Sequence, residues 1–188
     1  MRRSSFFLIA LALTLSAGPA LAHYPVNLKA SHNTVSKSTI LLDGTISFAV
    51  YADFSKAKDQ RSVRFALKEG DELNVEYLIV DAAPTNKLKS SQLPGVTITT
   101  PSGKKIVMKI NERSPFYEPY GKKNYFFLSR ISQSAEAGIY SITATAKAKS
   151  SAVLAIGRTE TRGEYLEVGS SARTCPITLK NEDLISEG

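Results

Sequence analysis

The chain is poor in the side chains that most often carry chemistry. It has no tryptophan, two histidines (His23 and His32) and one cysteine, Cys175. A single cysteine excludes a disulfide within the chain, so the fold must be stabilised by its hydrophobic core. A catalytic thiol needs a nearby base, and both histidines lie far from Cys175 in the sequence. We therefore expect Cys175 to be a small buried apolar residue rather than a nucleophile.

Several functional motifs are also missing. The sequence contains no glycine-rich phosphate loop, no G-x-S-x-G and no H-E-x-x-H. The basic residues are dispersed and form no block with interleaved aromatics, which gives nucleic-acid binding no support. These absences favour a protein that is not an enzyme and that does not bind nucleic acid.

Residues 1–22 have the three parts of a secretory signal. A basic start, Met1–Arg3, precedes an apolar run from Phe6 to Leu15, and an A-x-A site follows at Ala20–Ala22. The apolar run is about half the length that a bilayer core requires, and no later segment is apolar for long enough to span. Cleavage after Ala22 would produce a periplasmic or secreted protein without a transmembrane segment.

Removal of this segment leaves 166 of the 188 residues, the size of one ordinary domain. It also removes two of the 24 basic residues, which leaves 22 basic against 17 acidic residues, a net charge of +5. A mildly basic surface favours anionic polymers of the cell envelope. We expect one domain over residues 23–169, followed at 170–188 by an edge strand around Ile177 and Leu179 and a polar tail.

Apolar residues recur at every second position, which is typical of half-buried strands. Turn signals separate the strands, and no window keeps helical spacing for three turns. The pattern predicts an all-β fold: a two-layer antiparallel β-sandwich, resembling a jelly roll, of about eight strands. The expected strands lie at 46–50, 63–67, 73–79, 96–98, 106–110, 125–128, 140–144 and 153–156.

The clearest predicted hairpin joins the strands at 63–67 and 73–79 through the turn Lys68–Asp71, which contains a glycine. Two longer segments with prolines, 81–94 and 111–123, read as loops. Long loops of this kind often carry function.

Two stretches carry a resemblance to a known family. Residues 62–81 place an aromatic core residue before a K-E-G-D turn and an apolar strand, and Ala137–Thr143 followed by Val153–Gly157 reads G-x-Y-x-I … V-L-A-I-G. This ending resembles the final hairpin of bacterial pre-peptidase C-terminal-type β-sandwich domains, over roughly residues 60–158. The resemblance implies a non-catalytic accessory or binding module and assigns a role to no individual residue.

His23 is the first candidate for a site. As the first residue of the mature chain, it would offer an α-amine and an imidazole, nitrogen ligands that copper(II) prefers. In this start the chain resembles exported copper-binding β-sandwich proteins, and His32 would be the second ligand. The structural alternative is that His23 is simply the first residue of a frayed end.

The loop at 111–123 is the second candidate. Phe116, Tyr117, Glu118 and Tyr120 place aromatic rings and a carboxylate between prolines, a composition suited to stacking on sugars or on a protein partner. The alternative is that these rings cover one end of the sandwich.

The sequence thus predicts an exported, non-catalytic binding or accessory protein whose partner is a protein or a glycan of the cell envelope. Two alternatives stay open: a periplasmic or secreted copper-binding protein that uses His23, and a carbohydrate-binding module that uses the aromatic loop.

Overall fold

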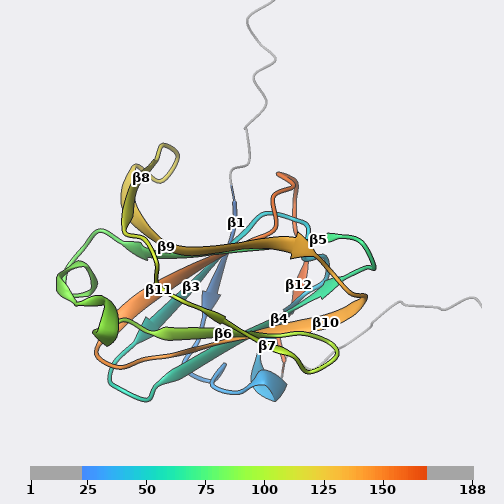
Figure 1. Cartoon of the computed structure of the whole chain (residues 1–188), viewed down its shortest axis with the longest axis horizontal. Helices are drawn as coiled ribbons and strands as arrows, with labels where there is room; N and C mark the ends of the chain where they lie inside the picture. Colours follow the sequence, from blue (N-terminus) through green and yellow to red (C-terminus); the bar gives the residue numbers. More distant parts are fainter. Residues whose placement is uncertain (1–22, 169–188) are drawn as a thin grey trace, which may run out of the picture.

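A computed structural model describes residues 23–168 as two six-stranded sheets packed face to face (Figure 1). Sheet I contains, in spatial order, β1 (Tyr24–Leu28), β3 (Phe48–Phe54), β11 (Ser150–Ile156), β5 (Glu72–Val80), β9 (Lys123–Ser134) and β8 (Ser114–Glu118). Sheet II contains β12 (Tyr165–Leu166), β2 (Thr39–Leu41), β4 (Gln60–Leu67), β10 (Gly138–Thr145), β6 (Gly95–Thr99) and β7 (Lys105–Met108).

Within the described residues, helical structure is limited to three single turns of 3₁₀ helix. These are η1 (Val35–Lys37), η2 (Thr85–Lys87) and η3 (Ser90–Gln92). Over residues 23–168, no helix has the length and apolar character needed to cross a membrane.

The predicted all-β sandwich is confirmed, with twelve strands instead of about eight. All eight expected strands exist, and β1, β2, β8 and β12 are added to them. The added strands have at most five residues, too few for a period of two to stand out. Both β1 and β8 contain a proline, Pro25 and Pro115, which an edge strand tolerates because one of its sides forms no ladder. The segment expected as a loop at 111–123 therefore contains the edge strand β8.

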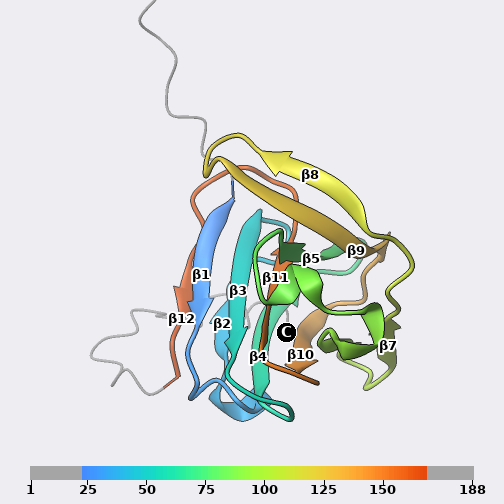
Figure 2. The same ribbon diagram turned by 90° about the vertical axis from the view of Figure 1, so that its left-hand side faces the viewer.

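The expectation of purely antiparallel sheets is corrected by two pairs of strands. β1 runs parallel to β3, and β2 runs parallel to β4. The other eight pairs are antiparallel, so each sheet is mixed. Figure 2 shows β1 and β3 side by side at one edge, with the β8–β9 pair extending across the other end of sheet I.

The predicted hairpin around Lys68–Asp71 is wrong. Its two strands, β4 and β5, belong to different sheets, so the turn carries the chain from one layer to the other. β10 and β11 are divided between the sheets in the same way. The reason is that alternation identifies the buried face of a strand but not the strand with which it pairs. The hairpin of β6 and β7 does form, with Val96 opposite Met108.

The core lies between the two sheets and contains several aromatic rings. Phe65 of β4 stacks on Tyr140 of β10, with ring centroids 5.4 Å apart. Buried tyrosines need a partner for their hydroxyl groups, and Tyr77 donates a hydrogen bond to the carbonyl of Pro94 at 3.0 Å. The hydroxyl of Tyr140 likewise bonds the backbone of Glu136. The packed core fixes the strands whose outer faces carry the candidate sites.

Candidate functional site

The outer face of sheet I carries a second apolar cluster, separate from the core. Side chains alternate along a strand, and here the outward-facing set is also apolar. Four of its members are buried, and four more aromatic or aliphatic residues pack against them: Leu78, Tyr125, Val153 and Ala155, with Tyr51, Val80, Phe116 and Phe127. An outward sheet face normally contacts water, so this one is shielded by part of the chain.

The shield is the β8–β9 pair. Phe116 lies opposite Tyr125 in the ladder, and its ring centroid is 5.1 Å from that of Phe127 and 6.4 Å from that of Tyr125. Between this pair and β3 lies a hollow of about 60 Å³, which we call the aromatic groove. Its lining residues are His23, Ala49, Tyr51, Glu76, Leu78, Phe116, Glu118, Tyr125, Phe127, Val153 and Ala155.

The groove has a one-sided charge. It is lined by two carboxylates, Glu76 and Glu118, and by no lysine or arginine, although the chain as a whole carries +7. Arg130 lies opposite Glu76 in the ladder, but its guanidinium pairs with Glu112 at 3.2 Å and stacks 3.8 Å over the ring of Phe127. The charged side chains that line the groove are therefore all negative.

The two carboxylates are held differently. Glu118 is engaged with the turn that follows β8, where its oxygens accept the backbone N–H groups of Tyr120 at 2.7 Å and Gly121 at 2.5 Å. Glu76 is half-buried, and its side chain has no hydrogen-bond or ion-pair partner within residues 23–168. Among residues 23–168, Glu76 is therefore the groove carboxylate that the protein's own contacts leave unpaired.

Two phenols complete the polar lining. The hydroxyl groups of Tyr51 and Tyr125 lie 3.5 Å apart. Burial raises the pKa of Tyr125, and the neighbouring Tyr51 and the charge of Glu118 raise it further. Tyr125 therefore stays a neutral phenol at physiological pH.

The structure divides the four candidate residues of the predicted loop into two groups. Phe116 and Glu118 face the groove, because they alternate along β8 with the outward-facing Tyr117. Tyr117 and Tyr120 point to solvent, with 56% and 59% of their surface exposed. The strand, not the loop predicted from the sequence, determines which side chains line the site.

His23 and His32 lie at opposite ends of β1. At about 3.3 Å per residue, the five residues of β1 keep the two imidazoles on the order of 15 Å apart. His23 lines the aromatic groove, where its Nδ1 lies 2.5 Å from Oγ of Ser47. Within residues 23–168 no three His, Cys, Asp or Glu side chains gather in a way that could hold a metal ion.

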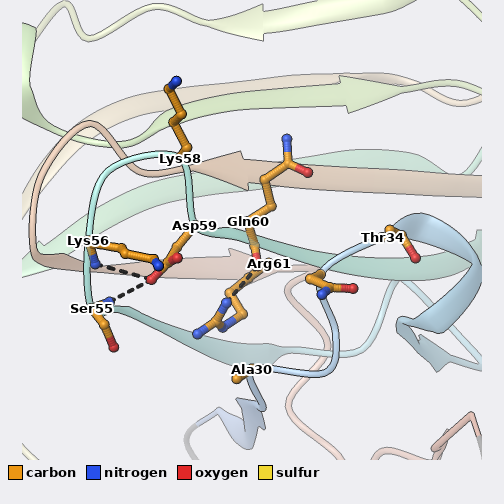
Figure 3. Close-up of a pocket in the computed structure, with 9 residues that line it drawn as sticks. Ala30, Thr34, Ser55, Lys56, Lys58, Asp59, Gln60 and Arg61 are labelled. Carbon is orange, nitrogen blue, oxygen red and sulfur yellow. Dashed lines mark hydrogen bonds between the residues drawn. The ribbon is translucent and has the colours of Figure 1, made fainter.

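A second hollow lies at the far end of β3, away from the aromatic groove. This polar cleft has a volume of about 540 Å³ and is lined by the turn after β3 and the loop after β1 (Figure 3). It contains Lys56, Lys58 and Arg61 together with one carboxylate, Asp59. Its charge is thus opposite to that of the groove.

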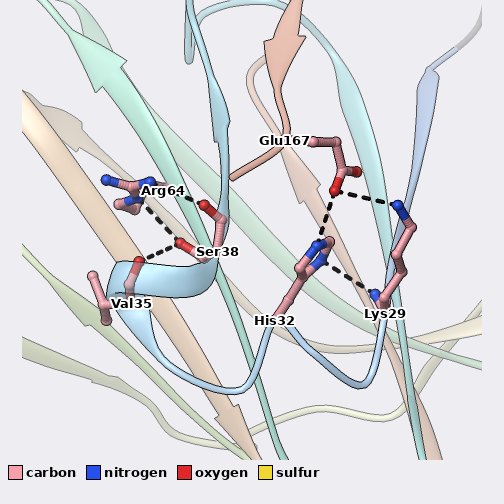
Figure 4. A network of polar contacts seen from close by, with 6 residues as sticks. All are labelled: Lys29, His32, Val35, Ser38, Arg64 and Glu167. Atoms are coloured by element: carbon pink, nitrogen blue, oxygen red, sulfur yellow. Dashed lines mark hydrogen bonds and ion pairs between the residues drawn. The ribbon is translucent and has the colours of Figure 1, made fainter. Parts of the chain in front are cut away.

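His32 belongs to a polar network that lies beside η1 (Figure 4). It is 2% exposed, its Nδ1 accepts the backbone N–H of Lys29 at 3.2 Å, and its Nε2 lies 3.0 Å from Glu167. Both ring nitrogens are therefore engaged within the protein. Nearby, Arg64 donates to the hydroxyl and carbonyl oxygens of Ser38.

Sequence reasoning missed Tyr51, Glu76, Tyr125 and Phe127 as groove residues. The first two belong to alternating strands, where polar or amphipathic residues on the outer face read as solvated. One signal was available in β11, which is apolar on both faces: its outward residues, Val153 and Ala155, are apolar like its inward ones. Cys175, the cleavage point after Ala22 and the predicted edge strand within 170–188 lie outside the described residues.

No family model matches this chain, and no curated protein matches it. The fold and the two hollows thus define the class: a twelve-stranded mixed β-sandwich with an aromatic, acidic groove on one outer face and a basic cleft at the opposite end of β3.

Proposed function

We propose that the protein is an exported, non-catalytic binding protein of the periplasm or the extracellular space, and that the aromatic groove is its ligand site. Export rests on the features of residues 1–22. Binding rests on one observation: Glu76, a half-buried carboxylate without a partner among the described residues, lies in a hollow walled by aromatic rings. Such a combination suits a cation, which gains from the carboxylate and from the ring faces together.

The volume of the groove limits which cation fits. A closed cavity that holds benzene measures about 150 Å³, so a hollow of about 60 Å³ takes the end of a chain and not a whole ring. A lysine side chain of a protein partner fits this description, because its methylene stem would contact Leu78 and Val153 while its ammonium pairs with Glu76. Arg130 on Phe127 is an example, within the same molecule, of a cation on this aromatic surface.

The test compares two probes of nearly equal size. We expect Nα-acetyl-lysine methyl ester, which keeps its side-chain ammonium, to shift the amide resonances of β5 and β9 in an NMR titration. Nα-acetyl-norleucine methyl ester, which lacks that charge, should shift them far less. Glu76→Gln should weaken lysine binding by about tenfold, the expected effect of losing one partly desolvated ion pair. Equal responses to the two probes would refute the ligand class, and no response to either would refute the site.

Copper binding is the second candidate, and the position of His23 favours it. The residue lines the same groove as Glu76 and the two tyrosines, so a mature N-terminus at His23 would bring an α-amine and an imidazole next to oxygen donors. Copper titration of correctly processed protein, compared with a variant that carries one extra residue before His23, tests it. Equal affinity for copper in the two proteins would exclude the His23 site.

A carbohydrate-binding module is the third candidate. Tyr117 and Tyr120 are exposed at the tip of the β8–β9 pair, where flat rings are open to stacking on a glycan of the cell envelope.

A further inference from the structure

Arg61 occupies a position that faces the interior of the sandwich. In the antiparallel ladder of β4 and β10, Phe65 lies opposite Tyr140, Val63 opposite Ile142 and Arg61 opposite Ala144. Every second residue of β4 faces the core, so Arg61 continues the series of Val63 and Phe65. The residue is 8% exposed, a degree of burial that arginine almost never has without a charged partner.

The charge of Arg61 has no counter-charge in the described part of the chain. Its Nη1 donates to the neighbouring carbonyl of Gln60 at 2.7 Å, and its guanidinium carbon lies 5.6 Å from the centre of the Phe54 ring. Its Nε is buried and has no hydrogen-bond partner. None of the ion pairs found among residues 23–168 includes Arg61.

The only carboxylate that lines the cleft, among the described residues, accepts hydrogen bonds from the backbone of the adjacent turn. One oxygen of Asp59 accepts the backbone N–H groups of Ser55 at 2.9 Å and Lys56 at 3.1 Å. These bonds, drawn in Figure 3, hold the turn after β3, and no ion pair among residues 23–168 joins Asp59 to Arg61. A buried, uncompensated cation disfavours folding unless something neutralises it.

The polar cleft offers room and further contacts for the missing anion. Lys56 and Lys58 add positive charge at its mouth, and Asn33, Thr34 and Gln60 add neutral polar groups. Gln60 donates its amide nitrogen to Thr145 at 3.2 Å, and its amide points away from the guanidinium of Arg61 (Figure 3). A volume of about 540 Å³ exceeds the needs of a single small ion.

We propose that the polar cleft is a binding site for an acidic sugar, whose carboxylate or phosphate pairs with Arg61 and whose hydroxyl groups bond Asn33 and Thr34. The fork of the guanidinium matches the paired oxygens of either anion. The site is separate from the aromatic groove and does not depend on the function proposed for it.

The test uses calorimetric or NMR titration of the processed protein with four probes: glucuronate, glucose 6-phosphate, glucose and inorganic phosphate. We expect one or both acidic sugars to bind at least tenfold more tightly than glucose and than inorganic phosphate. The tighter of the two acidic sugars identifies the anion as carboxylate or phosphate. Equal affinity for glucose and the acidic sugars would overturn the proposal, as would equal affinity for inorganic phosphate and the acidic sugars.

The matched variants are Arg61→Met and Arg158→Met. Each removes one positive charge, but Arg158 lies outside the cleft and its side chain is 63% exposed. We expect Arg61→Met to lose at least tenfold in affinity and to melt at an unchanged or higher temperature, because it removes an uncompensated buried charge. Arg158→Met should bind as the unmodified protein does, and equal binding by Arg61→Met would overturn the proposal.

A measurement on the unmodified protein covers the case in which Arg61→Met does not fold. The Nε–H of Arg61 has its own resonance in a ¹H–¹⁵N spectrum, and an oxyanion that pairs with the guanidinium group shifts that resonance. We expect the tighter acidic sugar to shift it in a saturable way and glucose to leave it in place. A resonance that does not move at saturating sugar would place the ligand elsewhere and overturn the assignment.

Discussion

The imidazole of His32 and the carboxylate of Glu167 meet at 3.0 Å, and this contact ties the loop after β1 to the end of the described chain. Because Nδ1 accepts the N–H of Lys29, the geometry assigns the ring proton to Nε2, which donates it to Glu167. Lys29 adds a cationic contact to the same carboxylate at 3.4 Å. His32 is thus a structural residue in this arrangement, and a metal ion on it would have to displace one of these bonds.

We expect His32→Ala to destabilise the protein by about 2 kcal/mol or more, because it removes a buried polar side chain and leaves its partners unsatisfied. Urea denaturation checks the stability. Copper affinity of the same variant should equal that of the unmodified protein, and a loss of copper affinity would restore His32 as a metal ligand.

The two exposed tyrosines provide a test of glycan binding that does not disturb the fold. Tyr117→Ala and Tyr120→Ala should each change the free energy of unfolding by less than about 0.5 kcal/mol, as is usual for exposed residues. A pull-down on insoluble glycans then measures binding without a contribution from lost stability. If the protein binds no glycan, or if the variants bind as well as the parent, the carbohydrate candidate is excluded.

Stability should fall steeply in alkali. Burial raises the pKa of Tyr77, Tyr125 and Tyr140 above the ordinary value of 10. In the unfolded chain these phenols lose their protons near pH 10, so above that pH the folded state binds more protons than the unfolded state. Because proton binding and folding are linked, the contribution of these phenols to the free energy of unfolding is complete below pH 10. It becomes progressively smaller as the pH rises above 10.

Absorbance of tyrosinate at alkaline pH measures this effect. Three of the eight tyrosines should ionise only together with the loss of the folded circular dichroism signal. A smooth titration of all eight near pH 10, with the fold intact, would contradict the burial of these rings.

Two glycines with positive φ allow the cost of backbone strain to be measured separately from the cost of a steric clash. Gly157 (φ +71°) and Gly103 (φ +85°) both adopt the left-handed region, which costs a non-glycine residue about 1 kcal/mol. A Cβ at Gly103 would meet no atom within 4 Å, whereas a Cβ at Gly157 would collide with the backbone of Thr45 and Ile46.

We therefore expect Gly103→Ala to cost about 1 kcal/mol and Gly157→Ala to cost at least about 2 kcal/mol more, since a clash with backbone cannot be relieved by a rotamer change. Chemical denaturation of the two variants side by side gives the difference. Equal costs would mean that the turn after β11 shifts freely to make room.

Alternation in the sequence was enough to predict the sandwich but not its pairing. The residues of β4 and β5 each show one apolar side, and that property is the same whether the strands form a hairpin or face each other across the core. Parallel neighbours such as β1 and β3 come from distant parts of the chain and leave no local turn signal. The pairing is therefore decided by how whole faces pack.

The candidate sites, like the fold, could be predicted from the sequence only in part. Phe116, Glu118 and His23 were identified from local composition, and they line the groove together. Glu76 and Arg61 could not be singled out, because a charged residue in an alternating strand usually faces water. Arg61 did carry a signal in retrospect, since its position continues the buried series of Val63, Phe65 and Leu67.

The entry of β1 beside the aromatic groove has a practical consequence for anyone who makes the protein. Because His23 borders the hollow, a purification tag fused ahead of it would start at the rim of the proposed ligand site. Recombinant material should therefore begin at His23 itself, released by a protease that leaves no scar, before any affinity is measured.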